Sequence, residues 1–253
     1  MRPQLNSSTM AAMSETASSS ITASPELNPA LDRKGLAESF RQAGRVHIPN
    51  VLTNVSAERI YRCLVQETKW SLTFNKGTHF LDLENVSQEE RSKFAFGAWE
   101  RARSDFQYFF DNHRLSVDGE PYPDQKHYHA KIVAFLNSPT LLAFIREVTG
   151  LAAIQRTDAQ ATLYRQGDFL TVHDDSTGGH KRLAAYVLNL TPIWRADWGG
   201  VLQFLDAAGH VEEGYVPCFN ALNVFRVPMQ HSVSQVALYG SLRYSITGWF
   251  HAR

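Results

Sequence analysis

The hydrophobic and polar positions of the chain form one pattern before about residue 150 and another after it. In the first half, apolar residues recur three or four positions apart, as in Leu36 and Phe40, and this spacing places them on one face of a helix. Capping residues and helix-ending glycines delimit the segments that show it. We therefore predict helices over residues 34–42, 56–65, 87–113 and 138–149.

Shorter segments of the first half are predicted strands. Residues 46–49 have a strand-like sequence. Residues 70–74 and 79–83 flank an Asn-Lys-Gly sequence whose residues tolerate positive φ, so we expect a hairpin there. Residues 118–123 are predicted to form a loop.

From residue 154 onward, short runs rich in β-branched and aromatic residues are separated by turn residues, with no helical segment between them. This pattern of short runs favours an antiparallel sandwich or barrel over an alternating α/β fold. The predicted fold class is therefore mainly β with N-terminal helices. The predicted strands are residues 160–164, 170–173, 183–190, 201–205, 221–227, 232–235 and 243–250.

Composition divides the chain into a leader and one domain. Residues 1–30 are rich in Ser, Thr, Ala and Pro and have almost no large apolar side chains, which predicts a disordered leader. A mis-called start, with Met10 or Met13 as the true first residue, is the alternative. Residues 31–253 are predicted to form a single domain, with 31–150 as helical support and 151–253 as the β core.

Charge and cysteine usage exclude several classes of protein. Of 253 residues, 43% are hydrophobic, so the chain can bury a substantial core. Lys+Arg 25 balances Asp+Glu 25, so we predict no direct binding to nucleic acid or to an anionic membrane. Cys63 and Cys218 lie far apart, which argues against a disulfide scaffold and suits a reducing, cytoplasmic location. No apolar run is long enough to predict a transmembrane helix.

Candidate metal ligands occur in the second half, at His173, Asp175 and His231. His173 and Asp175 are separated by one residue, and on a strand this spacing points both side chains to the same face. His231 stands where a turn gives way to the next predicted strand. Two imidazoles and one carboxylate occupy one face of an octahedral Fe(II) and leave the other positions open. The same ligands also suit manganese or zinc, so they do not identify the metal by themselves.

Arg243 makes the prediction more specific. A guanidinium in a buried barrel strand needs an anionic partner, and its planar shape matches a carboxylate. The far carboxylate of a bound 2-oxo acid would provide that partner. Ser245, two residues on, faces the same way and can donate to the same carboxylate. We therefore predict an oxygenase that uses Fe(II) and 2-oxoglutarate, with a structural ion pair as the other interpretation of Arg243.

Three motifs resemble the prolyl 4-hydroxylase superfamily of 2-oxoglutarate oxygenases. Residues 164–175 are YRQGDFLTVHDD, residues 197–202 are DWGGVL and residues 243–251 are RYSITGWFH. The last motif is similar to one branch in particular, the ribosomal-protein prolyl 3-hydroxylases of eukaryotes and their bacterial relatives. The resemblance covers residues 162–251 and implies a double-stranded β-helix core, also called a jelly roll or cupin-like fold.

The resemblance also implies a reaction and a role for each matching residue. His173, Asp175 and His231 would ligate iron, Arg243 would grip the distal carboxylate of 2-oxoglutarate, and Tyr164 would hydrogen-bond to it, with Ser245 as a helper. The implied reaction hydroxylates a prolyl residue of a protein or peptide and decarboxylates 2-oxoglutarate to succinate and CO2. Ascorbate is the expected reductant, and a ribosomal or translation-related protein is a candidate substrate.

Two other hypotheses remain at this point. The same iron chemistry would also serve a free amino acid or another small molecule, which an enclosed cavity with charged groups would favour. A zinc hydrolase or a non-enzymatic jelly-roll binding module is the third hypothesis. It predicts no decarboxylation of 2-oxoglutarate.

Overall fold

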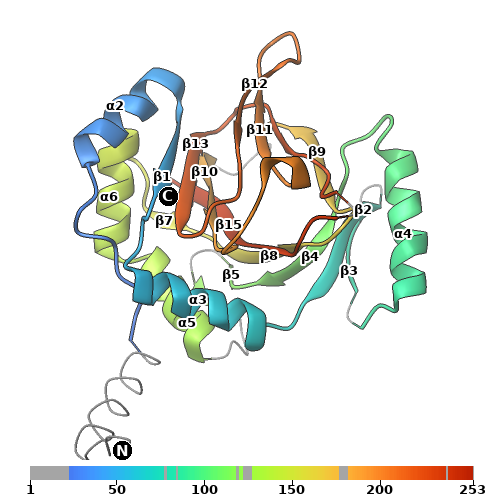
Figure 1. Cartoon of the computed structure of the whole chain (residues 1–253). Coiled ribbons are helices and arrows are strands. Elements are labelled where there is room, and N and C mark those ends of the chain that lie inside the picture. Colours follow the sequence, from blue (N-terminus) through green and yellow to red (C-terminus); the bar gives the residue numbers. More distant parts are fainter. Residues whose placement is uncertain are drawn as a thin grey trace, which may run out of the picture.

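The structure is a computed structural model that describes residues 23–76, 79–83, 85–117, 120–121, 127–176, 182–237 and 239–252. An antiparallel sheet curls into a nearly closed barrel, and helices cover it from outside (Figure 1). The predicted fold class, mainly β with N-terminal helices, is confirmed. The helices are α2 (Arg33–Ala43) and α6 (Pro139–Thr149) on one side, α3 (Asn54–Gln66) and α5 (His127–Leu136) beneath, and α4 (Gln88–Arg101) on the opposite side.

The large sheet runs along a single path from one wall of the barrel to the other. In spatial order its strands are β1 (Arg45–Pro49), β13 (Ala221–Arg226), β10 (Arg182–Asn189), β15 (Arg243–His251), β8 (Gln160–Tyr164), β4 (Tyr108–Arg114), β9 (Phe169–His173), β14 (His231–Val233), β11 (Leu202–Leu205) and β12 (Val211–Tyr215). β2 (Ser71–Lys76) pairs with β4 and with β3 (His79–Leu83), while β7 (Arg156–Thr157) pairs with β15. A separate pair joins β5 (Ser116–Val117) to β6 (Glu120–Pro121).

Alternation along β15 shows how the barrel is built. Tyr244, Ile246 and Phe250 belong to the main apolar core, in which the barrel meets the helices. Arg243 and Trp249, at positions of the other parity, line the interior cavity. Because successive side chains of a strand point to opposite faces, one strand supplies both the structural core and the candidate site.

Two helices of the first half, α2 and α6, begin and end within one residue of the ends that the capping signals predicted. α2 begins after Asp32, whose side chain accepts from the Gly35 amide, and ends at Gly44 with φ 67°. α6 begins after Ser138 and ends at Gly150 with φ 68°. These left-handed positions favour glycine, which has no Cβ to clash there.

The predicted helix over residues 87–113 is wrong beyond Arg101. α4 ends there, and the chain turns into β4, which pairs with β2, β8 and β9. Phe109 and Phe110 are neighbours in sequence, but they pack in different apolar clusters on the two faces of the strand. The closely spaced aromatic residues of α4 and β4 resembled one continuous helical face. Only the pairing of β4 with distant strands shows that the second segment is a strand and not a helix. The helix α5 and the strand β12 were not predicted.

The other predicted strands occur in the structure with shifts of one or two residues at their ends. The hairpin of β2 and β3 is confirmed by the pairing of Lys76 with His79, while residues 77–78 of its turn lie outside the described residues. Of the predicted loop, residues 118–119 and 122–123 also lie outside them.

The predicted leader falls mostly outside the described residues, which begin at Ala23. Its last part is attached to the domain. The Glu26 amide donates to Ser56 Oγ at 3.0 Å, and Leu27 forms an isolated β-bridge with Leu52. Contacts with the domain therefore begin before the predicted boundary at residue 31.

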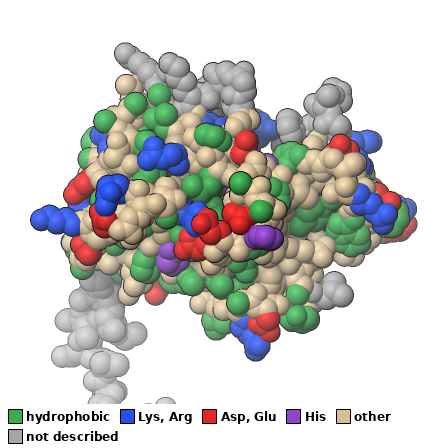
Figure 2. All heavy atoms as spheres, turned by 90° about the horizontal axis from the view of Figure 1, so that it is seen from above, with side chains coloured by type: hydrophobic (Ala, Val, Ile, Leu, Met, Phe, Trp, Pro, Cys, Tyr) green, Lys and Arg blue, Asp and Glu red, His purple; other side chains and the backbone are tan. Residues whose placement is uncertain are grey.

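None of the helices in the described ranges is by itself long and apolar enough to cross a membrane, although the bent pair Tyr128–Leu136 and Pro139–Thr149 reaches that length and composition together. Basic and acidic side chains are interspersed on the described part of the face shown in Figure 2.

Candidate metal and co-substrate site

The predicted site residues meet at one cavity inside the barrel. The cavity has a volume of about 550 Å³, and its wall includes His173, Asp175, His231, Arg243 and Tyr164. These side chains come from β8, β9, β14 and β15 and from the residues just after β9. The barrel thus brings together residues that lie up to 79 positions apart (243 − 164) in the sequence.

His173, Asp175 and His231 form a compact three-ligand cluster. His173 Nε2 lies 3.4 Å from Asp175 Oδ1, and His231 Nε2 lies 3.5 Å from Asp175 Oδ2. One donor atom from each residue falls within 4.8 Å of the others, close enough for all three to contact one ion. It is the only such group of three or more His, Cys, Asp or Glu side chains among the residues whose placement is described.

Backbone carbonyls orient both imidazoles in the same way. His173 Nδ1 lies 3.0 Å from the Thr171 carbonyl oxygen, and His231 Nδ1 lies 2.7 Å from the Met229 carbonyl oxygen. A carbonyl can only accept, so each Nδ1 carries the proton and each Nε2 presents its lone pair. Both lone pairs are on the nitrogens that approach Asp175, which is the arrangement that metal ligation by neutral imidazole requires.

Asp175 lies beside His173 as predicted, but the two residues are not on one strand, so the predicted reason was wrong. β9 ends at His173, and Asp175 has φ 62°, in the left-handed region. A turn after the strand therefore brings the carboxylate back toward the imidazole. Non-glycine residues rarely adopt this conformation, and such strain is concentrated at functional positions.

The local electrostatics keep the cluster ready to bind a cation. Burial, together with the neighbouring His173, lowers the pKa of His231 to about 4. Burial works against ionisation of Asp175, but the two imidazoles that face it hold its pKa below the ordinary value. Near neutral pH the cluster therefore presents a neutral His231 and an ionised Asp175.

This shift predicts a pH dependence of stability in the metal-free protein. The unfolded chain takes up a proton at His231 near the ordinary pKa of 6.5, whereas the folded chain does so only near 4. Protonation of His231 thus favours the unfolded state, and we expect the contribution of His231 to the free energy of unfolding to fall from pH 6.5 toward pH 4 by about 1.4 kcal/mol per unit of pKa difference. Asp175 has a pKa lowered from 3.8 and titrates below this window.

Urea unfolding at pH 7, 6 and 5 with a chelator present measures this slope. The difference in the free energy of unfolding between the wild-type protein and His231→Gln should fall from pH 7 to pH 5 by the contribution of His231. His210→Gln is the matched control, because the His210 side chain is 83% exposed, and it should leave the slope as in the wild type. A wild-type slope in His231→Gln would mean that another group causes the dependence.

Arg243 is buried without a carboxylate partner among the described residues. Its side chain is 2% exposed, and its Nε has no hydrogen-bond partner in that part of the chain. Its Nη2 donates to Asn189 Oδ1 at 3.4 Å, and its Cζ lies 4.9 Å from the centre of the Tyr164 ring. Burial lowers the pKa of Arg243, and Tyr164 offsets part of this effect. A buried guanidinium with this little compensation is costly unless an anion binds to it.

The Gly199-Gly200 turn makes room for this guanidinium. A Cβ on Gly199 would lie 1.9 Å from the Gln235 carbonyl oxygen, which no side chain can do. A Cβ on Gly200 would lie 3.2 Å from Arg243 Cδ. Both residues have positive φ, at 70° and 62°. Gly199 thus lets the backbone approach Gln235, and Gly200 lets it approach the Arg243 side chain.

We expect Gly200→Ala to raise the concentration of 2-oxoglutarate required for turnover, with Fe(II) binding retained, because the new methyl group presses on Trp194 and on Arg243, 3.1 and 3.2 Å from its carbon. Gly209→Ala is the matched control, since Gly209 also has positive φ, at 87°, but nothing lies within 4 Å of its added Cβ. Both variants should lose about 1–2 kcal/mol of stability from the left-handed backbone. An equal change of the 2-oxoglutarate requirement in both would show that backbone strain, and not Arg243, causes it.

Ser245 is the predicted site residue that the structure places differently. Its side chain is fully buried, and its Oγ lies 2.7 Å from Thr162 Oγ1 on β8. Thr162 lines the cavity, whereas Ser245 is not part of the wall. Sequence reasoning missed Thr162. The pairing of Ser245 with Thr162 in the β8–β15 register is the signal that would have identified it, and that register is not visible in the sequence.

Similarity to known proteins agrees with this geometry. The family described as the 2OG-Fe(II) oxygenase superfamily matches residues 159–251. This part of the chain is therefore similar to members of that superfamily. Fe(II) and 2-oxoglutarate are the groups that the family name implies, and the matched segment contains all six predicted site residues.

Curated relatives extend the comparison, and solved structures do so as well. The chain is 31% identical over 135 residues to prolyl 3-hydroxylase OGFOD1 of Mus musculus, a match that covers 51% of this chain and 24% of the relative. The chain thus spans about a quarter of the length of the curated relatives it matches.

Among solved structures, a 2OG-Fe(II) oxygenase family oxidoreductase from Burkholderia pseudomallei has a TM-score of 0.62 at 16% identity, covering 91% of this chain and 96% of its own. A prolyl hydroxylase from Trichoplax adhaerens, solved with a hypoxia-inducible-factor peptide, has a TM-score of 0.60 at 16% identity, covering 87% and 89%. These likenesses confirm the predicted double-stranded β-helix fold.

Proposed function

We propose that this protein is an iron- and 2-oxoglutarate-dependent dioxygenase that hydroxylates prolyl residues in a protein or peptide. The observation that carries the proposal is the coexistence, in one cavity, of a His-Asp-His cluster and a buried guanidinium without a described carboxylate partner. In this proposal His173, Asp175 and His231 hold Fe(II), and Arg243 holds the distal carboxylate of 2-oxoglutarate.

The residues present fit both groups. Two neutral imidazole nitrogens and one carboxylate are the donor set that leaves positions of an octahedral iron open for other ligands. The buried Arg243 Nε and Asn189 Nδ2 both lack hydrogen-bond partners among the described residues, and both can donate to a carboxylate. A zinc hydrolase would use the three metal ligands, but it would not need the buried donors of Arg243 and Asn189.

Bound Fe(II) and 2-oxoglutarate would supply, with O2, the oxidant for an unactivated C–H bond: one oxygen atom enters the product hydroxyl and the other enters succinate, with release of CO2. The chain's own residues bind, orient and exclude water. Tyr164 supports the Arg243 guanidinium through its ring, and its phenol is the proposed second donor to the co-substrate. The Thr162–Ser245 hydroxyl pair fixes the strands that carry these two residues relative to each other.

Apolar side chains close the cavity around the proposed reaction centre. Their role is to keep bulk water away, so that polar contacts inside are stronger and side reactions are fewer. The apolar members of the wall include Leu170, Val187, Leu202, Phe225 and Val233.

The substrate is the part of the proposal that rests most on relatives. The chain is similar to prolyl 3-hydroxylases in the segment that carries the site, so we propose a prolyl substrate, with a ribosomal or translation-related protein as the candidate class. Ascorbate as reductant and a cytoplasmic location, in keeping with the free cysteines Cys63 and Cys218, complete the proposal.

The test is a substrate panel with two readouts. The protein is incubated with Fe(II), 2-oxoglutarate, ascorbate and oxygen, together with prolyl peptides from ribosomal and translation proteins or with free amino acids. We expect a prolyl peptide to stimulate succinate release and to gain the mass of one oxygen atom. Stimulation by a free amino acid alone would assign the small-molecule reaction instead. No stimulated succinate with any compound would contradict the proposed hydroxylase.

A further inference from the structure

A second, smaller cavity opens beside the first and shares part of its wall. Its volume is about 300 Å³. We call it the annex. The side chains that line both cavities are Arg114, Gln160, Arg182, Thr247 and Trp249. A molecule that reaches the candidate metal site therefore has the annex within reach along this common wall.

Basic residues dominate the annex. Arg182, His251 and Arg156 lie next to one another on three adjacent strands, since His251 pairs with Arg182 on one side and with Arg156 on the other. Arg114 adds a third guanidinium to the wall. Among the described lining residues, Asp158 is the one with an acidic side chain. The three guanidiniums and one carboxylate of the described lining give the annex an excess of basic charge, which favours an anionic ligand there.

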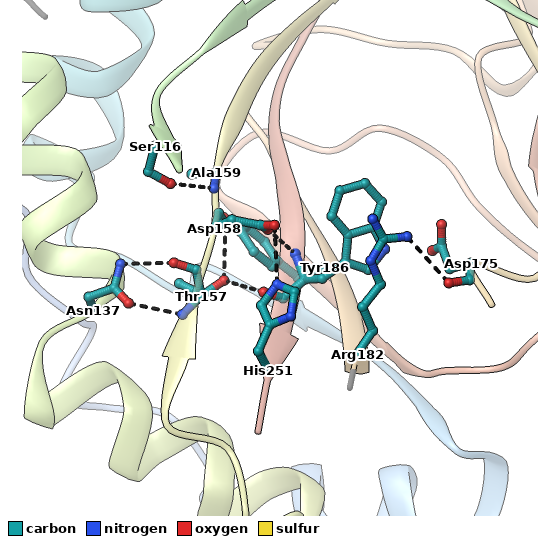
Figure 3. Close-up of polar contacts among 10 residues, drawn as sticks. Ser116, Asn137, Thr157, Asp158, Ala159, Asp175, Arg182, Tyr186 and His251 are labelled. Atoms are coloured by element: carbon teal, nitrogen blue, oxygen red, sulfur yellow. Dashed lines mark hydrogen bonds and ion pairs between the residues drawn. The ribbon is translucent and has the colours of Figure 1, made fainter. Parts of the chain in front are cut away.

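Asp158 is already engaged within the fold. Its Oδ1 accepts from the Trp249 amide at 2.7 Å, and its Oδ2 lies 3.1 Å from His251 Nε2. The Tyr186 hydroxyl donates to its backbone carbonyl at 2.9 Å. Figure 3 shows these contacts grouped on one side of Arg182. Asp158 therefore fixes the strand that carries Trp249, and its carboxylate already has these partners.

Arg182 stands between this group and the candidate metal site. Its Nη1 donates to the Asp175 backbone carbonyl at 3.3 Å, and its Cζ lies 3.7 Å from the centre of the Trp249 ring, as Figure 3 illustrates for the first contact. Its Nε is buried without a hydrogen-bond partner among the described residues. Stacking on an indole orients a guanidinium while leaving its edge available to a planar anion.

We propose that the annex binds a carboxylate of the substrate, with Arg182 as the residue that recognises it next to the reaction centre. This inference rests on the proposed hydroxylase function and adds a substrate class to it: a target proline with an acidic group close by in the chain. A carboxylate side chain and a chain-terminal carboxylate present the same chemistry to a guanidinium, so the test separates these two sources.

The test compares matched peptides on the same protein. Each peptide contains one proline and has blocked termini, and an aspartate or an asparagine occupies each of the three positions on either side in turn. Affinity is measured by fluorescence anisotropy with Fe(II) and 2-oxoglutarate present and oxygen excluded, and turnover by succinate release on adding oxygen. A further arm uses the asparagine peptide truncated after the proline with a free carboxyl terminus.

At one or more positions, we expect aspartate to bind about tenfold or more tightly than asparagine, as a charge-assisted contact to a guanidinium implies. Arg182→Gln should reduce this preference to about twofold or less, and Arg182→Lys should keep part of it. Arg195→Gln, which removes an exposed arginine paired with Asp197, should keep it in full. If only the truncated peptide, with its free carboxyl terminus, binds more tightly than the blocked asparagine peptide, the annex binds a terminal carboxylate.

The ratio of the two affinities separates recognition from damage to the metal site, because Arg182→Gln could weaken both peptides alike. A preference that is absent at every position in every arm, with succinate release stimulated equally by aspartate and asparagine peptides, would overturn the annex proposal and leave the hydroxylase intact. So would a preference that survives unchanged in Arg182→Gln. If no peptide or amino acid stimulates succinate release, the proposed function itself fails.

Discussion

Asp175→Ala is expected to abolish succinate formation and to remove Fe(II) binding, while the barrel stays folded. Asp175 is the only carboxylate in the three-ligand cluster, and each of its oxygens faces one imidazole. Without it, two neutral nitrogens remain and no anionic ligand balances the metal charge. We expect turnover to fall by about 100-fold or more, the scale on which removing an important electrostatic contact reduces catalysis.

Asp174→Asn is the matched control. Asp174 is the adjacent residue with the same charge, and its Oδ1 accepts from the Ser176 amide, a contact that asparagine can keep. Iron binding is measured by anaerobic titration and folding by circular dichroism. Turnover that survives in Asp175→Ala, or that is lost equally in Asp174→Asn, would contradict the ligand assignment.

Arg243→Met is expected to raise the 2-oxoglutarate requirement by about 10- to 100-fold or more, because a charged hydrogen-bonding contact is worth about 1.5–3 kcal/mol. The same substitution should leave the free energy of unfolding unchanged or higher. Methionine fills much of the space, and it removes a buried charge for which the described residues offer no carboxylate. Loss of co-substrate binding without loss of stability is characteristic of a residue kept for binding.

Titration with 2-oxoglutarate and thermal unfolding of the same preparation measure the two effects. Arg195→Met is the control, because Arg195 is exposed and pairs only locally with Asp197. If Arg243→Met unfolds the protein at a much lower temperature and leaves the 2-oxoglutarate requirement unchanged, Arg243 is a structural residue. The ion-pair interpretation of the sequence would then be preferred.

The meeting of the site residues was predictable because Tyr164, His173, Asp175 and Arg243 belong to short motifs, with His231 between them in the chain. His173, Asp175, His231, Arg243 and Tyr164 meet at one cavity, as the resemblance implied. Spacing alone gave the right neighbours for a wrong reason at Asp175, whose left-handed φ cannot be inferred from a residue count. The Gly199-Gly200 turn was part of a motif, but its contact with Arg243 required the fold.

Features that depend on pairing between distant strands were not predictable. The spacing of its aromatic residues made β4 resemble the end of a helix. It is a strand because β2, β8 and β9 pair with it. The annex depends on the register that aligns Arg182 and Arg156 with His251 from three separate segments. The sequence contains these residues, but nothing in their local spacing links them.

The central claim is that the His-Asp-His cluster and Arg243 together hold Fe(II) and 2-oxoglutarate. The most direct measurement is the visible absorption of the protein with both groups under anaerobic conditions, followed by succinate analysis after oxygen is admitted. The account predicts a charge-transfer band that needs both groups, that is lost in Asp175→Ala and that requires more 2-oxoglutarate in Arg243→Met. Absence of the band in the wild-type protein, with no succinate after oxygen is added, would contradict it.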